Sequence, residues 1–278
     1  MTDPITSPSN PRIKALVRLR NRRERDRSGR FLVEGYRELS RALGAGIVLD
    51  ELYVAPGLFL GHNEAALVAQ AAATGTEIID VADAAFARAS YRDRPEGLIA
   101  VARQFPAAIS DVDLSGNPLI LVVEGIEKPG NLGTMLRTAD AAGATAVIVA
   151  DPSTDPFNPN VVRASLGTLF TVPIAVTDSV AAIDWLRANR VQVLAATPLG
   201  AMPHHSVDLT GPTALVVGSE QYGLSDAWLE AADSRIVIRM PGSVDSLNAA
   251  MAAGILLFEA VRQREHLALP DRGGEEQR

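Results

Sequence analysis

The sequence predicts an α/β protein built from two domains. Its 278 residues exceed the length of an average domain, about 150 residues, by nearly a factor of two. Short apolar segments alternate with helical patterns in both halves, as is typical of strands and helices packed in layers. Residues 106–118, PAAISDVDLSGNP, are polar, rich in turn formers and without periodicity. We therefore expect one domain over residues 1–107 and another over residues 115–268.

In the first half, short strands are separated by helices. Strands are expected at 31–35, 49–56, 76–83 and 96–105. Helices are expected at 36–46 and 63–75, the second with Asn63 as its cap and Gly75 just beyond its end. This alternation predicts a small α/β sandwich.

The second half repeats the alternation with more apolar strands. They are expected at 118–125, 145–151, 171–176, 191–198, 213–220 and 234–241. Nearly continuous apolar strands separated by helices predict a mostly parallel sheet covered on both faces. The tail 268–278 is expected to fray.

The composition favours a soluble protein of the cytoplasm. Hydrophobic residues make up 47% of the chain, charged residues 21%, and cysteine is absent, so disulfides and thiolate metal sites are excluded. The N-terminus lacks the apolar core of a secretory signal. The longest apolar run, residues 249–258, is about half as long as a membrane span requires.

The charge is distributed unevenly. The whole chain carries −7, yet residues 1–41 hold eleven Arg and Lys residues against five Asp and Glu residues, a local +6. Such a segment is either a solvated basic helix or a contact surface for a polyanion. The candidate RNA-binding residues are Arg12, Lys14, Arg18, Arg20, Arg22 and Arg23.

Three unusual loops follow strands of the second half, and parallel sheets bind ligands at the carboxyl ends of their strands. They are GIEKPGNLG (125–133), GSEQYGLSD (218–226) and MPGSVDSLNAA (240–250). Neither the dinucleotide fingerprint G-x-G-x-x-G after the first of these strands nor the phosphate loop G-x-x-x-x-G-K-[ST] occurs. The absence of both motifs argues against a dehydrogenase and against a phosphate-loop nucleoside triphosphatase.

Several polar residues in these loops have a structural as well as a functional interpretation. Asn131, after the turn at Pro129–Gly130, and Ser246 are candidate helix caps, and Glu220 is a candidate cap for the helix that follows it. Arg137 stands in an otherwise small and apolar helix, whose Leu132, Met135 and Leu136 are expected in the core. The adjacent His204 and His205 lack a third metal ligand, so we expect a surface loop and no metal.

The three loops resemble the motifs of the SpoU/TrmH family, the RNA ribose 2′-O-methyltransferases of the SPOUT class that use S-adenosylmethionine. The matching segments are PGNLGTMLRTADAAGA with Asn131 and Arg137, LVVGSEQYGLSD with Glu220, and IRMPGSVDSLNAAMAAGILLFEAVRQR with Ser246 and Asn248. The first domain is similar to the family's RNA substrate-binding domain. Glu124 and Lys128 depart from the family pattern, which often has aspartates there.

The resemblance implies a C-terminal trefoil knot, an exception to the rule against threaded chains, and a homodimer. It also implies S-adenosyl-L-methionine as cofactor, bound by Thr197, Gly218, Ile238 and Leu247. The implied catalytic residues are Arg137, Asn131, Glu220, Ser246 and Asn248, with Arg137 acting as a base or as a clamp on the target phosphate.

The expected substrate is 23S ribosomal RNA, methylated either for housekeeping or for antibiotic resistance. Within the same class, transfer RNA is the alternative. A non-catalytic RNA-binding or ribosome-assembly protein on the same fold is a second hypothesis, and a Rossmann dehydrogenase or small-molecule methyltransferase is a third.

Overall fold

The computed structural model describes residues 3–268, so the fraying expected for the tail concerns residues that lie almost wholly outside it. Its Cα atoms form two compact units. The first comprises the chain up to residue 106 together with Lys128–Arg137 and Thr154–Thr171. The second comprises Ala107–Glu127, Thr138–Ser153 and the chain from Val172 onward. The first unit thus includes two segments that the sequence boundaries assign to the second domain.

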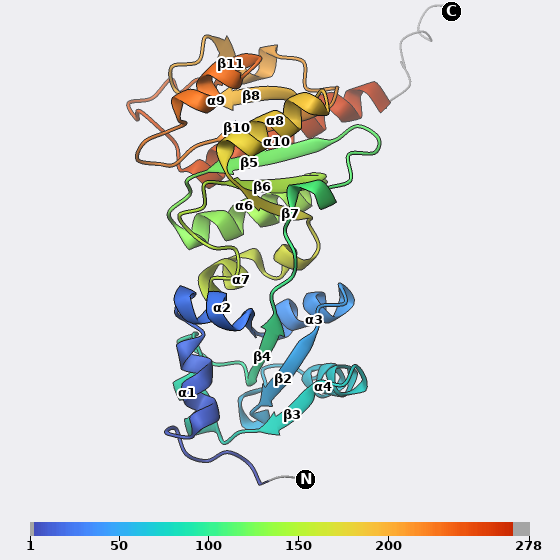
Figure 1. Cartoon of the computed structure of the whole chain (residues 1–278), viewed down its shortest axis with the longest axis vertical. Coiled ribbons are helices and arrows are strands. Elements are labelled where there is room, and N and C mark those ends of the chain that lie inside the picture. The colour runs from blue at the N-terminus through green and yellow to red at the C-terminus, as the bar shows by residue number, and fades with distance from the viewer. Residues whose placement is uncertain (1–2, 269–278) are drawn as a thin grey trace, which may run out of the picture. The chain divides into compact units, whose positions relative to one another are not determined.

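The first unit is built on a four-stranded sheet of order β1-β4-β2-β3, of which Figure 1 labels β4, β2 and β3. The strands are β1 (Arg30–Glu34), β2 (Leu49–Val54), β3 (Glu77–Asp80) and β4 (Leu98–Arg103). Strand β4 runs antiparallel to β1 and β2, whereas β2 and β3 are parallel. All four predicted strands are present. The surrounding elements are α1 (Pro11–Arg18), α2 (Arg22–Ser28), α3 (Tyr36–Gly44), the 3₁₀ turn η1 (Pro56–Leu58), α4 (Glu64–Ala73) and α5 (Asp83–Ala89).

The basic arm at the N-terminus folds as two short helices, α1 and α2. Asn10 and Asn21 cap them, because their side chains accept hydrogen bonds from the backbone N–H groups of Arg12 and Arg23, respectively. Ile13 and Leu16 of α1 are buried against Phe86 of α5 and other residues of the unit's core. The arm is therefore integrated into the first unit through its apolar residues.

Helix α4 begins where the sequence predicts, with Asn63 in the cap position and Gly75 beyond the end at φ +88°. Asn63 makes no side-chain capping bond. Instead, the carboxylate of Glu64 accepts a hydrogen bond of 2.8 Å from the backbone N–H of Gly61.

The second unit contains a seven-stranded sheet of order β7-β6-β5-β10-β8-β11-β9, in which Figure 1 labels all strands but β9. The strands are β5 (Leu119–Glu124), β6 (Ala146–Ala150), β7 (Ile174–Thr177), β8 (Gln192–Ala196), β9 (Met202–Pro203), β10 (Thr213–Val217) and β11 (Ser234–Val237). Neighbouring strands are parallel throughout, which confirms the prediction from their apolar composition. Only β9 was not among the predicted strands.

Helices cover both faces of this sheet. Helices α8 (Ser179–Ala188) and α9 (Asp226–Ala231) pack on one face, where Leu186 and Trp228 join Ile120, Val122 and Val216 in the core. Helix α10 (Ala249–Ala268) packs against β5 and β10 on the opposite face (Figure 1). The remaining elements are α6 (Pro129–Ala141), α7 (Pro159–Ser165) and the 3₁₀ turns η2 (Ile109–Asp111), η3 (Thr168–Phe170) and η4 (His204–Ser206).

The two edges of the seven-stranded sheet are short. At one edge, the backbone N–H of Val176 in β7 donates a hydrogen bond of 2.8 Å to the carbonyl oxygen of Ala107. The other edge is the two-residue strand β9, which contains Pro203. Among residues 3–268, none of the helices combines the length and the apolar character needed to cross a membrane.

Candidate active site

The loop after β5 leads directly into α6, which begins at Pro129. Proline is favoured in the first turn because its fixed φ suits the helix and it lacks an N–H that would need a partner. Asn131 consequently lies inside the first turn, with its backbone N–H bonded to the carbonyl oxygen of Lys128 at 3.0 Å. The alternative role of Asn131 as the cap of this helix is therefore wrong, because the cap position is Lys128, three residues earlier.

Helix α6 has one buried and one exposed face. Leu132, Met135 and Leu136 have no exposed surface, which confirms the prediction that they are core residues. Arg137 lies on the exposed face, as does Thr134 one turn earlier. This explains how one arginine is accommodated in a small, apolar helix: the apolar residues on the opposite face are buried while its own side chain is exposed.

The start of α10 links two of the three predicted motifs. Asn248 caps this helix, because its Oδ1 accepts hydrogen bonds from the N–H groups of Ala250 at 3.0 Å and Met251 at 3.3 Å. Its Nδ2 donates to Oε1 of Glu220 at 2.5 Å. The alternative role of Ser246 as the cap is wrong, since the helix begins at Ala249, directly after Asn248. Glu220 likewise does not cap α9, whose cap position is occupied by Ser225.

A pocket of about 420 Å³ lies in the second unit beside this pair. The loops after β8, β10 and β11 contribute to its lining, as expected at the carboxyl ends of parallel strands. Its walls are mainly apolar and include Leu224, Met240 and Ala252. Glu220 and Ser246 line it. So do all four predicted cofactor contacts: Thr197, Gly218, Ile238 and Leu247.

The loop after β10 makes one turn that excludes side chains. A Cβ atom added to Gly218 would lie 2.2 Å from the carbonyl oxygen of Gly223, which is far too close. Ser219 and Gly223 exchange backbone hydrogen bonds of 3.1 and 3.0 Å and close the turn. Glycine at position 218 is therefore required for this wall of the pocket to have its shape.

The far end of the same loop is held by Glu124, a buried carboxylate at the end of β5 that sequence reasoning did not assign to the site. Its Oε2 accepts a hydrogen bond of 2.8 Å from the N–H of Ser225, and its Oε1 accepts one of 3.3 Å from Oγ of Ser179. Nε1 of the buried Trp228 donates to the same hydroxyl at 2.8 Å. The signal in the sequence is an acid that ends an otherwise apolar strand.

Some arginines of the basic arm make hydrogen bonds or ion pairs with other residues of the chain. Nη2 of Arg20 donates to the carbonyl oxygens of residues 88, 89 and 90 at 3.3, 2.9 and 2.6 Å, which caps the C-terminus of α5. Arg12 pairs with Glu77 at 2.9 Å, and Arg22 lies 3.6 Å from Asp26. The contact of these arginines with RNA stays a prediction. The other candidate RNA-binding residues are exposed: Lys14, Arg18, Arg23.

The histidine pair lies in the turn η4. The rings of His204 and His205 are 5.4 Å apart and meet edge to face. No group of three or more His, Cys, Asp or Glu residues suited to holding a metal ion occurs in the part of the chain that the structure describes.

The structure thus brings Glu220, Asn248 and Ser246 together with the four predicted cofactor contacts in the second unit. Asn131 and Arg137 belong to the first unit. Comparison with known proteins shows the family of this chain. The model of the SpoU rRNA methylase family matches residues 118–258, about half of the chain. The chain belongs to the SpoU rRNA methylase family.

The region before this match also has known relatives. A model described as the MRM3-like substrate binding domain matches residues 10–100. Family members with assigned names align over nearly the whole chain. The "23S rRNA (guanosine(2553)-2'-O)-methyltransferase RlmP" of Bacillus subtilis strain 168 is 29% identical over 91% of this chain and 97% of its own length. The "23S rRNA (uridine(2479)-2'-O)-methyltransferase" of Streptomyces viridochromogenes is 34% identical over 88% of this chain and 87% of its own length.

Solved structures of SpoU family members have the same fold. The AdoMet-bound rRNA methyltransferase of Sinorhizobium meliloti has a TM-score of 0.86 and 33% identity over 95% of this chain and 98% of its own. The methyltransferase AviRb of Streptomyces viridochromogenes, in complex with AdoMet, has a TM-score of 0.84 and 32% identity over 92% of this chain and 100% of its own. A crystal structure of an RNA 2′-O ribose methyltransferase is 42% identical with a TM-score of 0.84, over 95% of this chain and 100% of its own.

Proposed function

We propose that this protein transfers a methyl group from S-adenosyl-L-methionine to a ribose 2′-hydroxyl of 23S ribosomal RNA. The observation that carries the proposal is the hydrogen bond between Asn248 and Glu220 beside a pocket lined by three loops of the parallel sheet. It joins the second and third family motifs at the place where such sheets bind ligands. The names of relatives that align over nearly the whole chain support the same activity.

The pocket suits the cofactor in size and character. Its volume of about 420 Å³ falls in the range of small-molecule sites, which is roughly 300–1,000 Å³. Apolar walls would surround the adenosine and the aliphatic chain, while the turn at Gly218 offers backbone groups without a side chain in the way. When bound, S-adenosylmethionine supplies an electrophilic methyl group on a sulfonium. We assign Thr197, Gly218, Ile238 and Leu247 to holding it.

The chain's own residues would orient the ribose and stabilise charge. Transfer forms a bond between O2′ and the methyl carbon, breaks the bond between that carbon and sulfur, and releases the hydroxyl proton to solvent or to a nearby phosphate. Guanidinium groups keep their proton at neutral pH, so we assign Arg137 to clamping the target phosphate and stabilising the developing oxyanion. Asn131, Glu220, Ser246 and Asn248 would fix the geometry of ribose and loop. Orientation of this kind contributes about 7–11 kcal/mol in favourable cases.

The 2′-hydroxyl is the group that distinguishes RNA from DNA, so the substrate is RNA. The two relatives named above are assigned to different nucleotides, a guanosine and a uridine, and both act on 23S rRNA. Their names support 23S rRNA as the substrate of this protein but do not agree on which base is the target. The exposed cations of the N-terminal arm would add salt-dependent affinity for the phosphate backbone. Activity on ribosomal RNA would place the protein in the cytoplasm.

We further propose that the active protein is a homodimer with a trefoil knot. On α10, the exposed apolar residues Met251, Ile255 and Phe258 are spaced by four and three residues and so share one helix face. A second copy of the chain would cover this face. The strand order of the seven-stranded sheet, in which β10 lies between β5 and β8, is compatible with the knot of the family.

Methyl transfer is tested with radiolabelled cofactor and ribosomal RNA from cells that lack this protein. We expect label in the large-subunit RNA and a linkage that resists alkali 3′ of one nucleotide. Arg137→Ala should lower transfer by at least about 100-fold while cofactor affinity is retained. Cofactor binding without transfer to any RNA would point instead to a non-catalytic RNA-binding protein. Label found in transfer RNA and absent from ribosomal RNA would replace the substrate.

The homodimer is tested by measuring molar mass in solution. We expect twice the mass of the 29.4 kDa chain, and a monomer for Ile255→Glu/Phe258→Glu. Val48→Glu, which also places a charge on an exposed apolar residue but lies between α3 and β2, should leave the dimer intact. A native protein that remains monomeric at the concentrations used for activity would contradict the proposal.

A further inference from the structure

Residues 154–171, here called the docking segment, belong to the family match by sequence and to the N-terminal sheet by contact. The segment contains α7 and the turn η3, and α7 packs against β1. This is unexpected, because the rest of the SpoU match between β5 and α10 lies mostly in the second unit. The docking segment contacts α2, β1 and α3 on one side and α6 on the other.

A buried ion pair holds the start of the docking segment. The guanidinium of Arg25 in α2 has no exposed surface and donates to both carboxylate oxygens of Asp155, at 3.3 Å from Nε and 2.5 Å from Nη2. Its Nη1 donates to the carbonyl oxygens of Leu19 and Arg20 at 3.0 and 2.8 Å. A guanidinium that donates to both oxygens of one carboxylate fixes the position and the angle of that carboxylate.

Aromatic packing joins the segment to the sheet on either side of α7. The ring of Phe157 lies 4.9 Å from that of Phe31 in β1 and 5.1 Å from that of Phe105. Phe170, beyond α7, lies 6.2 Å from Phe31. These distances are those of favourable aromatic pairs, so the segment is anchored at both ends.

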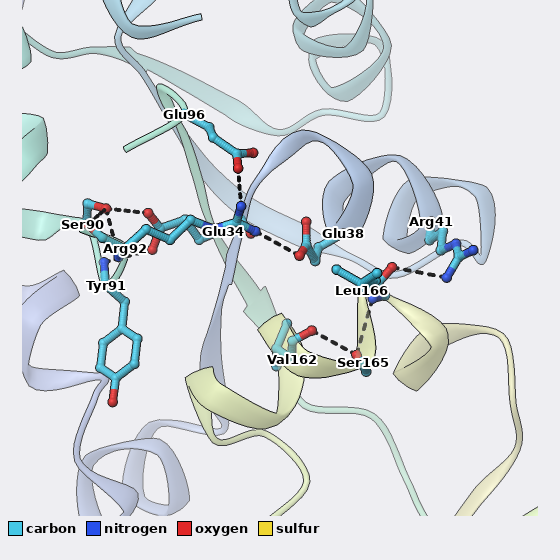
Figure 2. Close-up of polar contacts among 11 residues, drawn as sticks. Glu34, Glu38, Arg41, Ser90, Tyr91, Arg92, Glu96, Val162, Ser165 and Leu166 are labelled. Carbon is cyan, nitrogen blue, oxygen red and sulfur yellow. Dashed lines mark hydrogen bonds and ion pairs between the residues drawn. The ribbon is translucent and has the colours of Figure 1, made fainter. Parts of the chain in front are cut away.

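The end of α7 rests on α3. Nη1 of Arg41 donates to the carbonyl oxygen of Leu166 at 3.1 Å, and Figure 2 shows this contact beside the bond from the Ser165 hydroxyl to Val162. A Cβ on Gly167, whose φ is +88°, would lie 3.0 Å from Arg41 and 3.2 Å from Glu38. Glu38 is itself fixed by Arg92 at 2.7 Å. The helix on which the segment rests is therefore part of a rigid network.

On its other side, the docking segment carries α6. A Cβ added to Gly133 would lie 2.5 Å from Cβ of Ala164 and 2.8 Å from both the backbone N of Ser165 and the carbonyl oxygen of Val161. The backbones of α6 and α7 are therefore in direct contact, and only glycine fits at position 133. Arg137 follows one helical turn later, at the spacing of four residues that places two side chains on the same side of a helix.

We propose that the docking segment transmits the position of the N-terminal substrate-binding sheet to α6, and that Gly133 is a positioning residue for Arg137. RNA held by the first domain is then presented to an arginine that belongs to the same compact unit. The inference rests on the proposed role of Arg137 and adds the path by which its place is set.

The test compares two glycines in the same turn of α6. Gly133→Ala introduces the three close contacts above, whereas an added Cβ on Gly130 meets nothing within 4 Å, so Gly130→Ala is the matched control. The rate of a single turnover is measured at saturating ribosomal RNA and cofactor. Displacement of a reacting group by about 1 Å can lower such a rate about 100-fold. We expect a loss of at least about tenfold for Gly133→Ala and none for Gly130→Ala, with the cofactor Kd unchanged in both.

Two more variants separate positioning from general damage. Adding Ala164→Gly to Gly133→Ala removes the nearest of the clashing atoms and should restore part of the rate. Arg41→Leu removes the bond to Leu166 without touching α6 and should lower the single-turnover rate by about threefold or more. Equal rates for Gly133→Ala and Gly130→Ala, or a Gly133→Ala defect confined to the cofactor Kd, would overturn the inference. A rate for Arg137→Ala equal to that of the native protein would instead overturn the proposed role of Arg137 in the reaction.

Discussion

The buried pair of Arg25 and Asp155 allows a quantitative prediction about folding stability. Replacing Asp155 with leucine leaves the guanidinium of Arg25 without a counter-ion at a site that has no exposed surface. Removing one partner of a buried ion pair costs about 3–5 kcal/mol. For a protein of this size each kcal/mol lowers Tm by about 2–4 °C, so we expect Asp155→Leu to lower Tm by about 6–20 °C.

The double variant Arg25→Met/Asp155→Leu should be more stable than the single one. It removes the charge along with the counter-ion, and apolar replacements of a buried pair are often neutral. The carbonyl oxygens of Leu19 and Arg20 still lose their donors, at about 1 kcal/mol each. The double variant should therefore lie about 2 kcal/mol below the native protein, and above the single variant.

Urea denaturation followed by far-ultraviolet circular dichroism measures the differences in the free energy of unfolding as shifts in the urea midpoint. Heating the same samples gives the differences in Tm. The exposed pair of Arg27 and Glu24 is the matched control, and Arg27→Met should leave the midpoint unchanged because solvent screens such pairs. The reasoning is refuted if the single and double variants lose the same stability, or if Asp155→Leu denatures at the same midpoint as the native protein.

Three further predictions concern the pocket and the sheet of the first unit. Gly218→Ala should abolish measurable cofactor binding in calorimetry, because its Cβ would meet the carbonyl oxygen of Gly223 at 2.2 Å; an unchanged Kd would show that the turn is adaptable. Asn248→Asp retains an oxygen to cap α10 but faces Glu220 with a second carboxylate, so we expect the cofactor Kd to rise about tenfold with little change in Tm; equal binding would exclude a role for the pair. Burial raises the pKa of Glu34 above its ordinary value of 4.5, against the opposing hydrogen bonds from Ser90 and Tyr91. The native state then retains this proton longer than the unfolded state does, so stability should fall as pH rises from 4.5 through the raised pKa; Glu34→Gln should reduce that slope in urea titrations, and an identical slope would contradict the assignment.

Strands were the most predictable part of this fold. The strands β5, β6 and β10 are almost continuously apolar because both faces of the parallel sheet are covered, and that pattern is visible in the sequence. Helix starts were less predictable. Asn131 and Ser246 are residue types that often cap helices. The start of α6 is nevertheless set by Pro129 and that of α10 by Asn248. A cap is decided by backbone geometry, and several polar residues in one loop compete for the position.

The contacts of the docking segment could not be predicted. Asp155 is separated from Arg25 by 130 residues, and no local pattern marks the two as partners. Glu124 is a similar case, because its partner Ser225 lies 101 residues away. The resemblance to the family named six of the residues that line the pocket, but the residues that hold its loops in place emerge only from the packed structure.

The short edges of the seven-stranded sheet restrict how copies of this protein can meet. A free strand edge offers unpaired N–H and C=O groups on which another chain can extend the sheet, the route to uncontrolled aggregation. Here one margin is already engaged by Ala107, and the other is two residues long and ends at Pro203, which has no N–H to donate. Self-association is thereby directed away from backbone pairing and toward side-chain surfaces, where shape and composition select the partner.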